Sequence, residues 1–175
     1  HYYGGIKKYQ WTAIPLSLHG RVARKDGTMV DICLGEKEDD PIFVITDLLI
    51  HLAGEQMGKK ATEVVTGENL DLLIGNIPLE KDSDTSKEEK ETIKANVLKL
   101  LADQYGIDEE DFQSAELEIV PAGKARDCGF DRSMVLSYGQ DDRICAFTSL
   151  FAMLDAKCGT RTQCCLLVDK VEIGS

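Results

Sequence analysis

The sequence lacks the features that mark membrane-spanning, secreted and nucleic-acid-binding proteins. Among its 175 residues, no apolar run is long enough to cross a bilayer, and no basic and apolar signal peptide stands at its start. Lysine and arginine together number 20 against 31 aspartates and glutamates, so the formal net charge is −11. Binding to nucleic acid or to an anionic membrane requires clustered positive charge, and we expect neither partner.

Histidine and cysteine, the side chains that most often bind zinc, are also sparse or poorly spaced. There are three histidines, and none of the six cysteines forms a Cys-x-x-Cys pair. Several cysteines lie within apolar runs, where a thiol behaves as a small hydrophobic side chain. We therefore expect reduced thiols and a cytoplasmic protein.

The length suits one large domain or two small ones and allows a buried core. The sequence starts at His1 instead of methionine, and it stops at Ser175, shortly after the apolar run 164–168. Because native termini usually lie on the surface, away from core strands, we expect this sequence to be part of a longer protein.

Residues 18–115 have the pattern of a mixed α+β unit. Apolar and polar residues alternate on both sides of Asp26-Gly27, which predicts a hairpin with strands at 18–23 and 29–34. A further short strand is predicted at 70–78, where it ends at a proline.

Two amphipathic helices are predicted in the same region. The first covers 47–58, with Thr46 or Asp47 as its N-cap. The second has an apolar stripe over 93–105 and stops at Gly106.

Residues 116–175 have a different pattern, that of an α/β sheet. A strand is predicted at 116–120, and residues 143–154 are apolar nearly all round, which predicts a buried helix. Residues 163–168 form a continuous apolar run, as a central parallel strand requires. A strand, a buried helix and a second strand are typical of α/β domains.

Two acidic segments could carry chemistry in this second region. One is 139–143, which opens the predicted buried helix, and the other is 169–172, which follows the last predicted strand. Ligands of open α/β sheets gather beyond the carboxyl ends of strands, and carboxylates there commonly bind cations. Acidic residues are also common at helix starts and on loops that only face water, so both interpretations stay open.

Other kinds of site find less support. His51 lies on the predicted helix 47–58, where a lone histidine can be a surface or packing residue as well as a functional one. The glycines Gly4 and Gly5 lack the Gly-x-Gly-x-x-Gly pattern of a nucleotide loop. No nucleophile elbow accompanies a serine or cysteine.

Several motifs occur together along almost the whole chain. The most specific are Lys124-Ala125-Arg126-Asp127, Gly129-Phe130-Asp131-Arg132-Ser133, Tyr138-Gly139-Gln140-Asp141-Asp142-Arg143 and Asp169-Lys170-Val171-Glu172-Ile173-Gly174-Ser175. Residues 3–5, 18–22 and 45–52 add weaker matches. In this combination the chain resembles the aspartyl-aminopeptidase family of di-zinc metallopeptidases.

The resemblance implies an α/β catalytic domain that is interrupted by an α+β, β-rich dimerisation insert. Residues 1–17 would begin the catalytic domain, 18–115 would form the insert, and 116–175 would be a truncated α/β part of the catalytic domain. Members of the family remove N-terminal residues from peptides and assemble through dimers into dodecamers. Two zinc ions serve as cofactors, although cobalt or manganese can use the same ligands.

The resemblance also implies roles for particular residues. Asp141 would bridge the two metal ions, and Glu172 would be a terminal metal ligand. His51 would reach from the insert into the active site of a neighbouring subunit. Val171 occupies the position of the glutamate that acts as general base in the family.

Val171 departs from the family pattern, because a valine side chain cannot accept a proton. Loss of a general base typically lowers the rate by ~10²–10⁴. An incomplete zinc aminopeptidase and a non-catalytic oligomerisation subunit, or pseudo-enzyme, therefore both remain hypotheses. An unrelated α+β binding domain would require the motif matches to be accidental.

Overall fold

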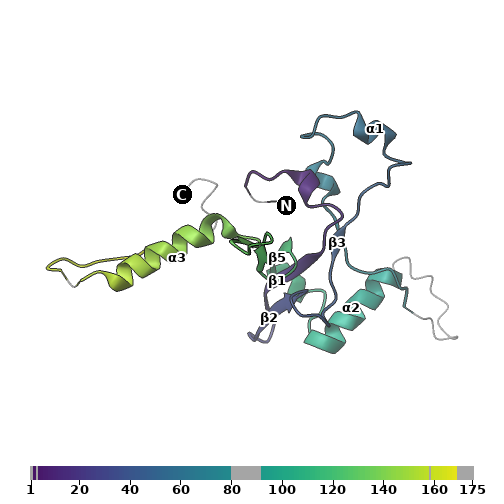
Figure 1. Cartoon of the computed structure of the whole chain (residues 1–175). Coiled ribbons are helices and arrows are strands. Elements are labelled where there is room, and N and C mark those ends of the chain that lie inside the picture. Colours follow the sequence, from purple (N-terminus) through teal and green to yellow (C-terminus); the bar gives the residue numbers. More distant parts are fainter. Residues whose placement is uncertain (1, 3, 80–91, 158, 169–175) are drawn as a thin grey trace. The chain divides into compact units, whose positions relative to one another are not determined.

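The computed structural model describes residues 2, 4–79, 92–157 and 159–168 (Figure 1). The chain forms two compact units, one of residues Lys7–Gly123 and one that combines His1–Ile6 with Lys124–Ser175.

A three-stranded antiparallel sheet organises the unit of residues 7–123. Strand β1 (Leu16–Ala23) lies between β2 (Met29–Leu34) and β5 (Glu116–Pro121). The turn between β1 and β2 contains Asp26 and Gly27, and the Asp26 carboxylate accepts hydrogen bonds from the backbone N–H and hydroxyl of Thr28. The predicted hairpin is therefore confirmed.

Strand β5 is confirmed as a strand, but it belongs to a different sheet from the one predicted. The sequence pattern places its residues in the α/β region. In the structure, β5 is an edge strand of the sheet whose central strand is β1, with Leu18 opposite Ile119. The pairing is antiparallel, and it joins two segments that are about a hundred residues apart in the sequence. A dimerising role for this unit stays a prediction.

The core of the unit lies on one face of this sheet. Val22, Ile32 and Ile107 are buried there, because every second residue of a strand points to the same side. Partly buried apolar residues surround them: Leu18, Val30, Leu34, Tyr105, Phe112, Ala115 and Leu117.

Helix α2 (Thr92–Tyr105) ends where the sequence predicted. Gly106 has a φ of 62°, and its backbone N–H donates to the carbonyl of Ala102. The guanidinium of Arg24 donates to the carbonyl of Tyr105, which would otherwise lack a helical partner. Ile107, directly after this helix end, is buried in the core. The short 3-10 helix η3 (Asp111–Ser114) follows.

The predicted helix at 47–58 is wrong for most of its length. Helix α1 covers only Gly54–Met57, and residues 47–53 form turns and irregular backbone. Asp47 does not cap a helix, because its carboxylate accepts from the N–H of the next residue, Leu48.

The predicted strand 70–78 is shorter in the structure. Strand β4 covers Leu72–Leu73, and it pairs with β3 (Val44–Ile45). Two further 3-10 turns are η1 (Lys8–Gln10) and η2 (Gly67–Asn69).

The other unit contains a hairpin of β6 (Arg126–Cys128) and β7 (Met134–Leu136), followed by helix α3 (Gln140–Asp155). The predicted helix at 143–154 is confirmed, but its predicted burial is not. Phe147 and Leu154 are 60% and 67% exposed, and no residue of α3 is buried. Within the described part of this unit, only a two-stranded sheet accompanies the helix, which is too little to cover an apolar surface on all sides.

The predicted central strand at 163–168 is wrong for the structure as described. Residues 159–168 form neither helix nor strand, and Leu166 is 80% exposed. A central strand needs a partner on each side for its backbone groups, and no described strand pairs with this segment.

Every cysteine that the structure describes is a free thiol, while Cys158 lies outside the described residues. No described helix combines the length and the apolar character that crossing a bilayer requires.

Candidate functional site

Asp141 lies at the start of α3, where the backbone departs from regular helix. Gly139 precedes it in a left-handed conformation, with a φ of 73°, and both Asp141 and Asp142 have non-helical backbone angles. The peptide bond between these two aspartates is cis. The Asp141 side chain is exposed and forms no hydrogen bond or ion pair with any residue that the structure describes. Its two carboxylate oxygens are therefore open to a ligand.

Neighbouring residues hold this turn in place. The side-chain amide of Gln140 donates to the carbonyl of Val135 in β7, at 2.9 Å. The backbone N–H of Arg143 donates to the carbonyl of Gly139, and the guanidinium lies over that glycine. A Cβ atom at position 139 would lie 3.3 Å from Nε of Arg143, so that glycine suits both the positive φ and the close approach.

The open carboxylate of Asp141 fits a metal ligand in its chemistry. Carboxylate oxygens are regular zinc ligands. A zinc site also needs further ligands, and the described residues contain no group of three His, Cys, Asp or Glu side chains suited to a metal. Glu172 and Val171 lie outside the described residues, so the pairing of Asp141 with Glu172 stays a prediction.

His51, the remaining predicted site residue, lies in a turn of the residue 7–123 unit and not on a helix. The imidazole is exposed, and the residues beside it are exposed and apolar. They are Leu48, Leu49, Ile50 and Leu52, with 53%, 56%, 65% and 68% exposure. The structure therefore presents His51 at the tip of an apolar loop, which extends from residue 47 to 53.

The base of this loop is a hydrogen-bond cluster that sequence reasoning missed. Oδ1 of Asp47 accepts from the N–H of Leu48 at 2.8 Å and from Nε2 of Gln56 at 2.9 Å, and Oδ2 lies 3.2 Å from the hydroxyl of Thr12. Nε2 of Gln56 is also 3.4 Å from the carbonyl of Val64. The hydrogen bonds from Gln56, Leu48 and Thr12 hold the pKa of Asp47 below its ordinary value. No periodic pattern in the sequence signals such a cluster.

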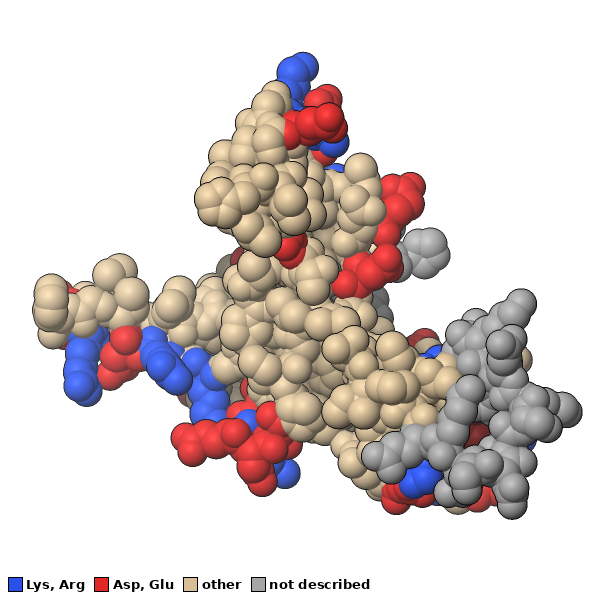
Figure 2. Space-filling model, turned by 90° about the vertical axis from the view of Figure 1, so that its right-hand side faces the viewer, with Lys and Arg blue, Asp and Glu red and all other residues tan. Residues whose placement is uncertain are grey.

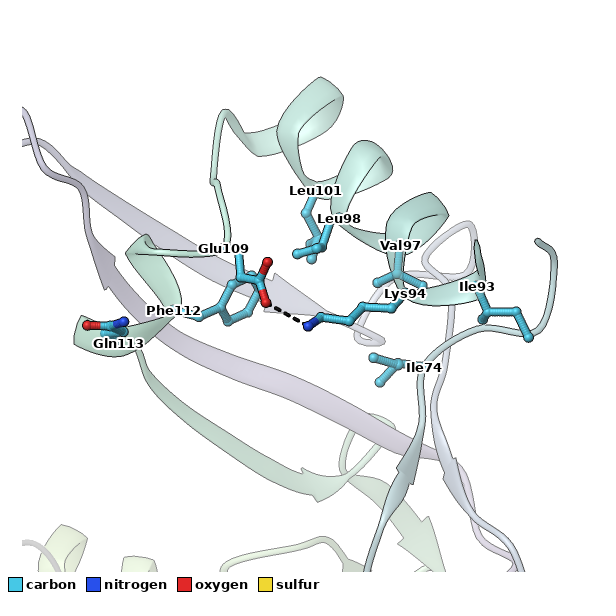
Figure 3. Close-up of a pocket in the computed structure, with 9 residues that line it drawn as sticks. All are labelled: Ile74, Ile93, Lys94, Val97, Leu98, Leu101, Glu109, Phe112 and Gln113. Atoms are coloured by element: carbon cyan, nitrogen blue, oxygen red, sulfur yellow. Dashed lines mark ion pairs between the residues drawn. The ribbon is translucent and has the colours of Figure 1, made fainter. Parts of the chain in front are cut away.

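A hollow of the residue 7–123 unit contains none of these residues. It has a volume of about 610 Å³ and lies beside α2 (Figure 3). Aliphatic side chains of α2, together with Ile74 and Phe112, form most of its wall, and Lys94 and Glu109 form an ion pair of 2.7 Å across it. An aliphatic wall with one ion pair supplies no acid–base pair or metal ligand set, so this hollow is not a candidate active site.

The charged side chains visible on one face do not mark a site. On the face that Figure 2 shows, basic and acidic side chains stand close together in small groups. Exposed ion pairs of this kind include those of Lys25 with Glu110 and of Arg21 with Asp31. Such exposed pairs contribute little to stability.

Comparison with known proteins gives a match over the whole chain. The family model described as aminopeptidase I zinc metalloprotease (M18) matches residues 1–175. A probable M18 family aminopeptidase 1 of Clostridium acetobutylicum is 60% identical over 175 residues, which are all of this chain and 37% of the relative. The corresponding protein of Thermotoga maritima is 52% identical over the same share.

Solved structures agree with the sequence relatives. The crystal structure of the M18 aminopeptidase from Thermotoga maritima superimposes with a TM-score of 0.80 at 54% identity, covering 90% of this chain and 33% of that chain. For aminopeptidase I from Clostridium acetobutylicum the TM-score is 0.78 at 58% identity, with the same coverage. The mixed α/β arrangement with antiparallel sheets is thus shared, and the chain spans about 37% of the length of its curated relatives.

Proposed function

The chain belongs to the M18 family of aminopeptidase I zinc metalloproteases, and from this premise we propose that it is part of a zinc-dependent aminopeptidase that removes N-terminal residues from peptides. The observation that carries the proposal is the family match along all 175 residues. The exposed side chain of Asp141, which the resemblance assigns to the metal site, supports it. The activity belongs to a protein of the length of the relatives, of which this chain corresponds to about 37%.

In this proposal the metal is held by residues of two segments. Asp141 would bridge two zinc ions and Glu172 would bind one of them, with cobalt or manganese as possible replacements. Zinc bound there would act as a Lewis acid on the scissile carbonyl group.

His51 would contribute from a neighbouring copy of the chain. Its exposed position in the 47–53 loop supports this role, because an imidazole at the tip of a loop can reach a surface outside its own unit. The apolar residues around it would become buried in such an assembly, and exposed apolar patches commonly mark interaction sites. We therefore propose a homo-oligomer formed through residues 18–115, in which dimers build a dodecamer. The proposal also places the protein in the cytoplasm, as the sequence predicts.

Val171 favours a second function, that of a non-catalytic oligomerisation subunit. The position that the resemblance assigns to a general-base glutamate is apolar here. A subunit of this kind would keep its assembly surface and bind metal with little or no turnover.

The experiment compares the complete protein that contains this chain with its Val171→Glu variant. Both are assayed on aminoacyl p-nitroanilides, and their zinc content is measured by elemental analysis and their assembly by light scattering. If Val171 replaces the general base, the glutamate raises kcat by ~10²–10⁴. Equal and robust activity in both forms would show that the base assignment is wrong. Inactivity of both, with intact assembly, would favour the non-catalytic subunit.

A further inference from the structure

The loop that presents His51 is anchored at both ends and exposed between them. Ile45 before the loop and Ala53 after it are only 4% and 3% exposed, whereas the apolar side chains of the tip are more than half exposed. Two backbone hydrogen bonds close turns within the tip. The N–H of Leu52 donates to the carbonyl of Leu49, and the N–H of Ala53 donates to the carbonyl of Ile50. Few buried contacts hold the tip itself, so its order depends on what fixes the base.

Asp47 is the residue through which the base is fixed. Its carboxylate joins three segments: the backbone of Leu48 at the start of the loop, the side chain of Gln56 in α1 after it, and Thr12 from a segment 35 residues earlier. Thr12 is 8% exposed and therefore gives the cluster a rigid attachment to the body of the unit. Gln56 extends the cluster to the carbonyl of Val64.

We infer that Asp47, with Thr12 and Gln56, is a positioning residue for His51. The inference rests on the proposed function, since it takes His51 to act in the active site of a neighbouring copy. A histidine that enters another subunit must arrive in one orientation, because a displacement of about 1 Å at a reacting group can lower a rate ~10²-fold. A loop that is already held at its base before the copies meet avoids the entropic cost of ordering the loop during assembly.

The clamp depends on hydrogen-bond geometry more than on charge, which makes it testable by conservative substitution. An asparagine at position 47 can place its Oδ1 where the carboxylate accepts from Leu48 and Gln56. Its Nδ2 would then donate to the hydroxyl oxygen of Thr12, and that hydroxyl can donate to the carbonyl of Tyr9, which lies 3.2 Å away. Alanine at position 47 removes all of these interactions.

The test is a double-mutant cycle in the complete, assembled protein. We expect Asp47→Ala to lower kcat/KM about 10- to 100-fold, mostly through kcat, and Asp47→Asn to stay within about threefold of the wild type. In a His51→Ala background, Asp47→Ala should have no further effect, because it acts through the histidine that has been removed. Hydrogen exchange of residues 48–57 should be faster in Asp47→Ala, while zinc content and oligomer mass stay unchanged.

Asp40→Ala is the matched control. It also removes a carboxylate that accepts three hydrogen bonds in the same unit, from the N–H groups of Gly35, Glu36 and Lys37, but it leaves the 47–53 loop intact. A further loss of activity from Asp47→Ala in the His51→Ala background, or equal losses in Asp40→Ala and Asp47→Ala, would overturn the inference. So would a normal Asp47→Ala enzyme. Failure of the proposed function is distinct, because then the wild type would be inactive or His51→Ala would be fully active.

Discussion

Substitution of Gly20 by alanine should separate the central strand from β5. Gly20 lies in the middle of β1, between Ile32 of β2 and Leu117 of β5. A Cβ atom there would lie 1.9 Å from the carbonyl oxygen of Glu116 and 2.9 Å from Cα of Leu117. Both are backbone atoms, which cannot turn aside as a flexible side chain can, so β5 has to move.

The magnitude follows from two costs. The φ of Gly20 is 149°, and a side chain in that region costs about 1–3 kcal/mol. Displacement of β5 weakens one or two backbone hydrogen bonds, at about 1 kcal/mol each. The total is about 2–5 kcal/mol, and for a chain of this size each kcal/mol lowers Tm by about 2–4 °C. Calorimetry of the Gly20→Ala protein should therefore show a fall of about 4–20 °C, with faster hydrogen exchange in residues 16–23 and 116–121.

Gly27→Ala is the matched control for this substitution. Gly27 also has a positive φ, of 83°, but no atom lies within 4 Å of the position of its Cβ. Only backbone strain remains, at about 1–2 kcal/mol. If Gly20→Ala lowers Tm no more than Gly27→Ala does, the steric argument for a close approach of β1 and β5 is wrong.

Two further predictions concern carboxylates of the same unit. Asp111 is 5% exposed and accepts from the N–H groups of Lys25 and Asp108, so Asp111→Ala, which leaves two donors without an acceptor, should lower stability by about 2–4 kcal/mol in thermal unfolding. A fall of less than 1 °C in Tm would contradict this. At Asp40, hydrogen bonds from the N–H groups of Lys37, Gly35 and Glu36 lower the carboxyl pKa. Its stabilising contribution is thus complete above the ordinary carboxyl pKa of 3.8 and is lost as the pH falls through the lowered value. The Tm difference between wild type and Asp40→Asn should be present at pH 7 and close below that range, and a difference independent of pH would refute the assignment.

The turn and helix-end signals in the sequence predicted local structure correctly. The Asp26-Gly27 turn and the alternation around it specified the β1–β2 hairpin, and Gly106 marked the end of α2. Each of these features is decided by a few neighbouring residues. The partner of β5 was not predictable in this way, because alternation identifies a strand but does not say which distant strand it pairs with.

The helix expected at 47–58 failed for a physical reason that the sequence does not display. Its apolar residues have helical spacing, but the residue expected to cap it is engaged by two side chains, Thr12 and Gln56, from outside the first turn. Tertiary hydrogen bonds thus overrode a local pattern. The histidine at position 51 was identified from the motif around it, while the cluster that holds its loop became visible only in three dimensions.

For the candidate metal site, the assignment of Asp141 as a ligand stays a prediction, and its surroundings were not predictable from the sequence. The motif 138–143 singled out Asp141, and the structure places this residue on non-helical backbone with an open carboxylate. The left-handed Gly139 and the bond from Gln140 to β7 account for that backbone. The apolar character of residues 143–154 on nearly all sides predicted the helix that follows and also its burial, but burial depends on what packs against a helix, which no property of the helix itself specifies.

Asp47 and Asp111 show why the chemistry of the partner decides what a carboxylate tolerates. Both accept hydrogen bonds on two oxygens. At Asp111 both partners are backbone N–H groups, which can only donate, so the Nδ2 of an asparagine would face a donor and the substitution should destabilise the protein. At Asp47 one partner is the Thr12 hydroxyl, which can accept as well as donate, and asparagine should be tolerated. Asp111→Asn should therefore unfold at a lower temperature than Asp47→Asn. Equal Tm values would mean that the charge of the two carboxylates, and not the direction of their hydrogen bonds, determines how this unit is held together.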